Sequence, residues 1–324
     1  MKLINSSFGI LEQEPGLQGI YKQIELAGRT CYKSLDKITK DSAKDFVDRM
    51  INSKHYAMLE HGTVYLLFSR CCYDRHDEEF IDKYIENPYS KVVYIGTDDN
   101  LVEQTSGKEN YLGDILGTGV YGNALYTITT NYRVLVENNW LDDLKYLCEP
   151  TEYHEKRVTV RFTTSNGIMR ELTRHRSHSF AVESTRYCNY SKNKFNNEIT
   201  FIQPYWFTHD CTKKYLNKLN VLKYTPKDNY TPEENLFLTH LLDVEEKYMG
   251  LINLGLKAQE AREILPLATK CDMVMTGFVS DWSHFFRLRT SIIAETGKPH
   301  PDASALADPL YKDFIARGYM ESLV

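Results

Sequence analysis

The feature that most constrains this chain is residues 174–187, where three arginines, two histidines and three serines occupy fourteen positions. Such a density of functional groups is hard to explain as packing. Guanidinium groups bind phosphate or carboxylate through paired hydrogen bonds, imidazoles donate or accept hydrogen bonds, and hydroxyls orient a ligand. The run therefore predicts a site for a polyanionic ligand. The alternative is a solvated basic turn, the usual role of a run of charges.

The net charge of the chain helps to define that ligand. With 44 acidic and 39 basic side chains, the formal net charge is −5. An acidic protein with one local group of arginines suits a small anion better than a nucleic-acid strand, so general nucleic-acid binding is not expected. The composition, 42% hydrophobic and 26% charged, is typical of a globular protein, and 324 residues fit either two domains or one α/β unit with an insertion.

Residues 1–7 lack the apolar core of a signal peptide, and no apolar run is long enough to span a bilayer, so we expect a cytoplasmic protein without a membrane segment. The cysteines form no Cys-x-x-Cys pair, which argues against a disulfide scaffold or a thiolate zinc site. Most of them are expected to be free buried thiols. There are seven: Cys31, Cys71, Cys72, Cys148, Cys188, Cys211 and Cys271.

Apolar periodicity and capping residues predict the main elements around the basic run. Thr231, Pro232 and Glu234 form a capping box at the start of a long helix. Trp282, Phe285 and Phe286 are expected to be core residues of a later helix. In chain order the sequence predicts a helix capped by Asp41, a strand over 64–68, a strand over 158–162, a helix after Asn166 that runs through Ile168, Met169 and Leu172, the helix after Thr231, and helices over 259–264 and 282–289.

Residues 73–157 differ from the rest of the chain and are interpreted as an insertion. They contain clusters of Asp and Glu and a polar, glycine-containing segment over residues 96–107. A helix is expected around residues 124–135, because Leu125, Ile128, Tyr132 and Val136 recur at steps of three and four. This helix would pack on the core while the acidic parts stay solvated.

The helix that precedes the basic run is expected to deliver it. Steps of four along a helix would place Arg170 with Arg174 and Glu171 with His175. Arg174 and Arg176 would then point apart and could bind two different ligands.

The order Arg-His-Arg, seven residues and then Ser184, with Arg186 and Tyr187 directly behind, resembles the signature of flavin-dependent thymidylate synthases. In that family the signature binds deoxyuridine monophosphate (dUMP) and the flavin together. This chain departs from the pattern at Ala181 and Val182, where the family usually has Asn-Glu.

Other segments resemble the family in the same order along the chain. His55 and Glu60-His61 match part of its flavin pocket, and residues 261–266 match its Ala-Arg-x-x-Leu-Pro element. Residues 282–289 match its closing helix, and the 27 positions from Arg262 to Arg289 equal the expected separation of two nucleotide-binding arginines. The resemblance implies an α+β fold, a mixed sheet packed with helices, in one domain over residues 1–324 with the insertion at about 73–157.

The resemblance also implies which residues form the site. Arg289 and Ser184 are expected to be catalytic, and no metal ligands are expected. The expected dUMP-binding residues are Glu171, Arg174, Ser184, Thr185, Arg186, Arg262 and Arg289, and the expected FAD-binding residues are His55, Arg174, His175, Arg176, Glu183 and His284.

The activity implied is that of a methyltransferase that converts dUMP to dTMP. Methylenetetrahydrofolate supplies the carbon, NADPH reduces the bound FAD, and the flavin carries the redox chemistry. Such an enzyme needs no sulfur nucleophile, and no cysteine here has the Pro-Cys-His context of the unrelated conventional thymidylate synthases. The family forms homotetramers whose active sites are shared between subunits.

Two other classes of function fit parts of the sequence. A metal-dependent phosphohydrolase could use His175, His178 and Glu183 as ligands, although the surrounding arginines oppose cation binding. An RNA-binding module could use the arginines of residues 174–186 together with the many tyrosines, although the acidic balance opposes it.

Overall fold

The computed structural model describes residues 1–70, 75–97, 124–212, 230–295 and 297–323. The chain forms two compact units, one of Met1–Leu11, Ala27–Lys37 and Thr159–Val324 and the other of Glu12–Leu26 and Ile38–Val158. Helix α1 (Gly16–Cys31) contributes residues to both. The fold is α+β, as expected, because antiparallel sheets and one parallel strand pair combine with helices. Cys71, Cys72 and most of the polar segment 96–107 lie outside the described residues.

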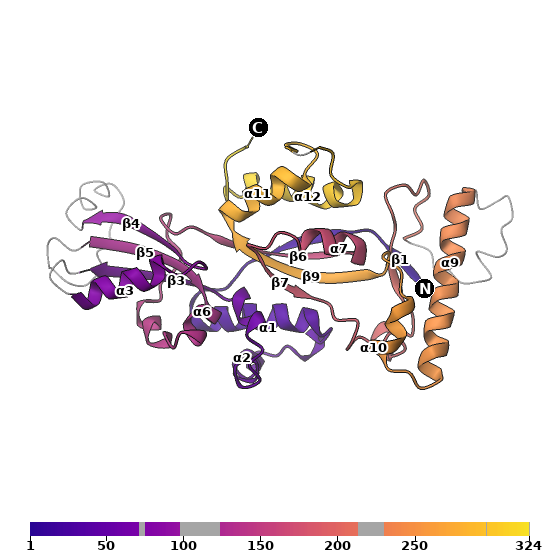
Figure 1. Cartoon of the computed structure of the whole chain (residues 1–324), viewed down its shortest axis with the longest axis horizontal. Coiled ribbons are helices and arrows are strands. Elements are labelled where there is room, and N and C mark those ends of the chain that lie inside the picture. The colour runs from indigo at the N-terminus through magenta and orange to yellow at the C-terminus, as the bar shows by residue number, and fades with distance from the viewer. Residues whose placement is uncertain (71–74, 98–123, 213–229, 296, 324) are drawn as a thin grey trace. The chain divides into compact units, whose positions relative to one another are not determined.

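The first unit is built on a four-stranded sheet in the order β2–β6–β9–β7 (Figure 1). Aromatic side chains form its core: the ring of Phe162 on the sheet lies 6.4 Å from those of Trp282 and Phe285, and Phe314 lies 5.1 Å from Phe286. The core role expected for the aromatic residues of the closing helix is confirmed, since all three are fully buried. The elements are β2 (Ser7–Leu11), β6 (Arg157–Ser165), α7 (Asn166–Leu172), β7 (Ser179–Val182), β9 (Lys270–Phe278), α11 (Val279–Arg289) and α12 (Pro301–Ala316).

The first unit contains a second hydrophobic cluster, in which Leu3, Phe201, Leu241 and Tyr248 are all fully buried. It packs the long helix against a parallel pair of strands. The helix begins with the predicted capping box of Thr231 and Glu234. The elements are β1 (Lys2–Ile4), η1 (Leu35–Lys37), η4 (Asn193–Phe195), β8 (Thr200–Ile202), α9 (Pro232–Asn253), α10 (Ala258–Ala261) and η5 (Arg262–Ile264).

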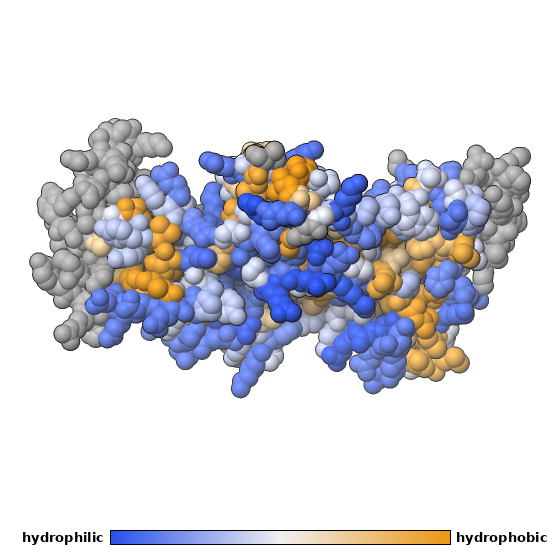
Figure 2. Space-filling view, turned by 45° about the horizontal axis from the view of Figure 1, so that its top comes forward, coloured by the Kyte–Doolittle hydropathy of each residue, from blue (hydrophilic) through white to orange (hydrophobic). Residues whose placement is uncertain are grey.

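Apolar side chains are also exposed around α9. Leu236 is 75% exposed and Leu254, the residue after the helix, is 81% exposed. On the face drawn in Figure 2, orange hydrophobic residues gather over the region of α9, whereas blue hydrophilic residues predominate elsewhere on this unit.

The second unit contains an antiparallel sheet in the order β3–β5–β4. Two of its three strands, β4 and β5, come from the region interpreted as an insertion, and β5 pairs with β3, which precedes that region. The interpretation of the chain as one family domain with an insertion stays a prediction. The elements are α2 (Ser42–Asn52), η2 (Tyr56–His61), β3 (Thr63–Arg70), α3 (Arg75–Ile85), β4 (Lys91–Thr97), β5 (Ala124–Asn131), α6 (Tyr132–Glu137) and η3 (Leu141–Tyr146).

The helix predicted around residues 124–135 is wrong over most of its length, because residues 124–131 form strand β5. This strand lies between two others, and Leu125, Thr127 and Ile128 are all buried although they point to both faces. Burial on both faces removes the period of two that identifies a strand, and β-branched residues pack well in a central strand. Only the last part is helical: α6 starts where the Asn131 side chain accepts the Val134 N–H.

The remaining predicted elements are present with small differences at their ends. Helix α2 follows Asp41 as predicted, but the Asp41 side chain makes no capping hydrogen bond. Helix α7 ends at Leu172, so the four-residue steps predicted to pair Glu171 with His175 do not continue along a helix. Helix α12 was not predicted. Across the described residues, no helix combines the length and the apolar composition needed to cross a membrane.

Candidate active site

The first unit contains a pocket of about 470 Å³ between the turn after α7 and the end of α11. Its wall is basic, since it carries three arginines and two histidines together with one serine and one leucine. Anions therefore suit it better than cations. The lining residues are Arg174, His175, Arg176, Ser177, His284, Leu288 and Arg289.

Local hydrogen bonds place the basic run at this pocket. The Ser165 hydroxyl caps α7 by accepting the Ile168 N–H at 3.2 Å. After the helix the chain makes a turn, in which Arg174 N–H donates to the Glu171 carbonyl (3.4 Å) and His175 N–H donates to the Leu172 carbonyl (3.2 Å). The turn brings the side chains of the basic run to the end of α11.

Arg289, the last residue of α11, is held by three hydrogen bonds. Its Nη1 donates to Glu171 Oε2 at 2.7 Å, its Nη2 to the Glu171 carbonyl at 2.8 Å, and its Nε to His175 Nε2 at 3.1 Å. A guanidinium has five N–H groups, so two remain for a ligand. The side chain is 16% exposed. Arg289 is therefore a fixed donor at the wall of the pocket.

His175 is buried and acts as a hydrogen-bond acceptor. Its ring centroid lies 5.0 Å from that of Phe285 and 6.0 Å from that of His284. Burial lowers its pKa to about 4, and the neighbouring Arg289 and His284 lower it as well. The imidazole is therefore neutral at neutral pH, and because Nε2 accepts from Arg289, its proton is on Nδ1.

His178, the second histidine of the run, packs into the interior. It is 5% exposed, and its ring centroid lies 4.7 Å from that of Trp282. The ring lies against Gly277 of β9, where a β-carbon would come within 2.3 Å of its Cδ2 atom. His178 thus anchors the basic run to the sheet.

A second group of predicted residues lies directly after β7. Ser184 donates its N–H to the Cys31 carbonyl at 3.1 Å, and Arg262 Nη1 donates to the Thr185 hydroxyl at 3.4 Å. The Arg186 guanidinium is exposed and lies 5.5 Å from the centre of the Tyr187 ring. This segment presents hydroxyl and guanidinium donors to the surface.

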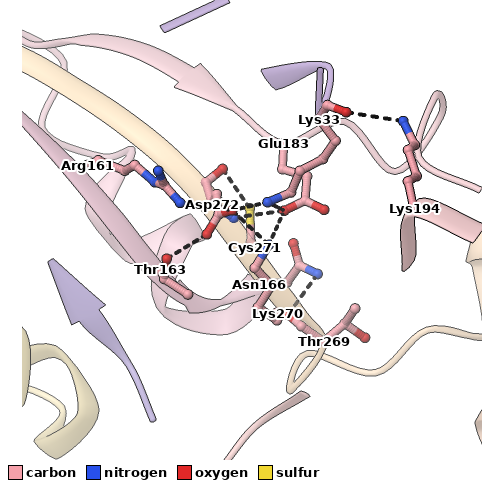
Figure 3. Close-up of polar contacts among 10 residues, drawn as sticks. All are labelled: Lys33, Arg161, Thr163, Asn166, Glu183, Lys194, Thr269, Lys270, Cys271 and Asp272. Carbon is pink, nitrogen blue, oxygen red and sulfur yellow. Dashed lines mark hydrogen bonds and ion pairs between the residues drawn. The ribbon is translucent and has the colours of Figure 1, made fainter. Parts of the chain in front are cut away.

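The two remaining predicted residues lie elsewhere. Glu183 is buried in a cluster of ion pairs with Lys270 and Asp272 and does not line the pocket (Figure 3). His55 is half-buried at the start of η2, in the second unit. Sequence reasoning missed Ser177 and Leu288 as pocket residues. Leu288 lies one turn after His284, and this spacing on α11 could have identified it.

No group of three or more His, Cys, Asp or Glu side chains in the described part of the chain could hold a metal ion. The ligand set considered for a phosphohydrolase, His175, His178 and Glu183, is therefore not assembled.

Comparisons with known proteins agree with the sequence resemblance. The model of the thymidylate synthase complementing protein family matches residues 150–314, just over half of the chain. The chain is 30% identical over 162 residues to a probable flavin-dependent thymidylate synthase of Paramecium bursaria Chlorella virus 1, covering 48% of this chain and 67% of that protein. It is 27% identical over 116 residues to the flavin-dependent thymidylate synthase of Haloarcula marismortui, covering 35% of this chain and 45% of that protein.

Solved structures that match the chain share little sequence with it. The UMP/dUMP methylase PolB from Streptomyces cacaoi, bound with 5-Br dUMP, is 14% identical with a TM-score of 0.41, and the match covers 99% of this chain and all of that one. Thymidylate synthase X from Helicobacter pylori, with FAD and dUMP, is 14% identical with a TM-score of 0.36, covering 95% of this chain and 92% of that one. From the extent of the family match and the identity with the viral relative, the chain belongs to the thymidylate synthase complementing protein family, that of the flavin-dependent thymidylate synthases.

Proposed function

We propose that this chain is a flavin-dependent thymidylate synthase, which converts dUMP to dTMP with methylenetetrahydrofolate as carbon donor and NADPH as reductant of bound FAD. Family membership and the names of the two relatives support this activity. The observation that carries it at the level of residues is the fixed guanidinium of Arg289, which has two free N–H groups at the wall of a basic pocket.

The residues of the pocket fit a phosphate-bearing flavin. Arg174 and Arg176 are exposed cations that can bind phosphate, and His175 and His284 add polar ring edges. Leu288 adds an apolar wall, and the volume of about 470 Å³ lies in the usual range for ligand pockets. When bound, the flavin supplies the hydride for the reductive methylation.

Arg289 is proposed to act on the pyrimidine ring of dUMP. A fixed guanidinium can stabilise the negative charge that develops on the uracil as its C5 becomes nucleophilic. Glu171 Oε2 and the Glu171 carbonyl orient this guanidinium, which leaves Oε1 to accept the imide N–H of the pyrimidine. His175, neutral because its pKa is lowered to about 4, keeps its acceptor nitrogen directed at Arg289.

The phosphate and sugar of dUMP are proposed to bind at the segment after β7. Thr185 and Arg262 are already in contact there, and Arg186, the residue after Thr185, is exposed. Ser184 is proposed to assist catalysis by orienting the nucleotide. His55 is proposed to contact FAD, and Arg174 is proposed to contact both dUMP and FAD.

Two further properties belong to this proposal. We propose a homotetramer whose active sites are shared between subunits, so that residues of the signature act across chains. The cytoplasmic location expected from the sequence stays a prediction.

The proposal is tested with the purified full chain. FAD is titrated in the presence of the protein and binding is followed by quenching of flavin fluorescence, with micromolar affinity expected. Formation of dTMP is then measured with dUMP, methylenetetrahydrofolate and NADPH, and omission of FAD from apoprotein serves as the control. A folded sample that binds no FAD at micromolar concentration, or forms no dTMP with all substrates present, contradicts the proposal.

A further inference from the structure

Glu183 ends the pairing of β7 with β9 by means of its side chain. Its N–H donates to the Asp272 carbonyl at 2.8 Å, while its carboxylate Oε2 accepts the Asp272 N–H at 3.0 Å. In an antiparallel ladder the Asp272 N–H would instead donate to the backbone carbonyl of Glu183. Because the side chain replaces that carbonyl, the main chain leaves β9 directly after Glu183. Ser184 then donates its N–H to the carbonyl of Cys31, the last residue of α1.

Two lysines pair with this carboxylate and also with a second carboxylate, that of Asp272. Lys270 Nζ lies 2.7 Å from Glu183 Oε2 and 2.9 Å from Asp272 Oδ2. Lys33 Nζ lies 3.4 Å from Glu183 Oε2 and also pairs with Asp272 (Figure 3). We call Lys33, Glu183, Lys270 and Asp272 the ion-pair cluster. Its two carboxylate side chains are 2% and 3% exposed, so its charges are neutralised by one another rather than by water.

The cluster faces the interior of the first unit. Glu183 Oε1 is buried and accepts no hydrogen bond from the described residues. Burial raises the pKa of Asp272, but Lys270 and Lys33 outweigh this effect and hold it well below its usual range. Asp272 is therefore ionised and keeps both lysines in place, while the Thr163 hydroxyl donates to its other oxygen at 2.6 Å.

A buried ion pair contributes little net stability, but removal of one partner leaves an uncompensated charge and favours a different arrangement. The cluster joins the turn after α1, the end of β7 and the start of β9. The next two residues after Glu183 are Ser184 and Thr185, and the Thr185 hydroxyl accepts from Arg262 Nη1 at 3.4 Å. The position of this contact depends on where the chain leaves β9.

We infer that Glu183 is a positioning residue for nucleotide binding, which holds Ser184 and Thr185 beside Arg262 through the ion-pair cluster. The inference rests on the proposed function, in which these residues bind the phosphate and sugar of dUMP. It differs from the direct flavin contact that the family resemblance implies for Glu183, because the carboxylate is buried and absent from the pocket wall.

The test compares wild type with Glu183→Gln and measures Kd for dUMP and for FAD separately, with kcat at saturating dUMP. We expect Kd for dUMP to rise about tenfold or more and Kd for FAD to stay within about twofold, while kcat at saturating dUMP falls because Ser184 moves with the same segment. The matched control is Glu234→Gln, which alters a buried carboxylate remote from the cluster in sequence and should change neither Kd. A variant that loses only thermal stability overturns the inference, as does one that loses affinity for FAD and not for dUMP.

Two more variants keep the test decisive. Glu183→Gln combined with Lys270→Met restores the charge balance, because Lys33 still neutralises Asp272. The double variant should therefore have a Kd for dUMP at least about threefold lower than that of Glu183→Gln alone. If Glu183→Gln does not fold, Lys33→Met removes the more exposed lysine and should give the same selective loss of dUMP affinity. Unchanged dUMP affinity in a folded Lys33→Met protein contradicts the inference.

The two levels of the proposal fail in different ways. If the wild-type protein binds no dUMP, the proposed function itself is contradicted. If the wild-type protein binds dUMP and the variant binds it equally well, only the role of Glu183 is contradicted.

Discussion

Replacing Arg289 by lysine separates the geometry of this side chain from its charge. The guanidinium makes three hydrogen bonds, at 2.7 and 2.8 Å to Glu171 and at 3.1 Å to His175. An ammonium on a flexible stem can keep the ion pair with the carboxylate but cannot also reach the other two acceptors in one plane. Two hydrogen bonds from a charged group are lost, and because Arg289 and Glu171 are partly exposed the cost in stability is about 1–3 kcal/mol.

The loss in catalysis is expected to be larger than this loss in stability. Removing a preorganised donor to developing charge typically lowers turnover by about 10²–10³, which corresponds to roughly 2.7–4 kcal/mol of transition-state stabilisation. Arg289→Ala is expected to show at least this loss. The assay measures release of the C5 proton of dUMP at saturating nucleotide, at a temperature where the variants are folded, together with Kd for dUMP.

The neighbouring Arg287 provides a matched control on the same helix. It is 41% exposed in its ion pair with Glu295, so Arg287→Lys should change turnover little. If Arg289→Ala binds dUMP less tightly yet releases the C5 proton at the wild-type rate when saturated, Arg289 only anchors the nucleotide and its catalytic assignment is wrong.

Three further predictions concern pH, a helix cap and the thiols. Because the pKa of His175 is about 4 in the folded chain and about 6.5 when unfolded, the unfolded state binds more protons between these values. The contribution of the neutral His175 to the free energy of unfolding, up to about 3 kcal/mol, is complete above pH 6.5 and lost as the pH falls towards 4. His175→Gln should therefore reduce the change of the free energy of unfolding over this pH range, as measured by chemical denaturation. Burial raises the pKa of Glu234, but hydrogen bonds from Thr231 and Thr208 outweigh this and hold it at about 2. Glu234→Gln should therefore lower the free energy of unfolding by about 1–2 kcal/mol at pH 7 in chemical denaturation, and this difference should vanish as the pH falls from 4.5 to 2. Burial and the neighbouring Glu183 raise the pKa of Cys31 to about 11, so its thiol is not a nucleophile, and Cys31→Ser should retain dTMP formation; complete loss in a folded protein that binds dUMP contradicts this.

Local patterns were sufficient for most helices of the first unit. The capping box of Thr231 and Glu234, and the aromatic spacing of Trp282, Phe285 and Phe286, depend on residues within one or two turns, so they can be read from the sequence. Strand β5 could not be recognised in this way. Both of its faces are buried in the folded chain, and its two partner strands are distant in the sequence.

The contacts of the candidate site show the same limit. The spacing of the basic run indicated an anion site, but the partner of Glu171 was predicted to be His175, four positions on. The partner in the structure is Arg289, 118 positions away. The burial of Glu183 likewise depends on lysines from two other segments. Such pairings follow from the packing of α7, α11 and the sheet, which no local pattern describes.

The contact between Gly277 and His178 limits how the sequence can vary. Any side chain at position 277 would meet the imidazole, since even a β-carbon would lie 2.3 Å from it. In a close-packed interior such an overlap is relieved only if the neighbour becomes smaller. Among natural variants of this enzyme, a larger residue at position 277 should therefore occur only together with a smaller residue at position 178, so that these two sites, about a hundred positions apart, are expected to change as a pair.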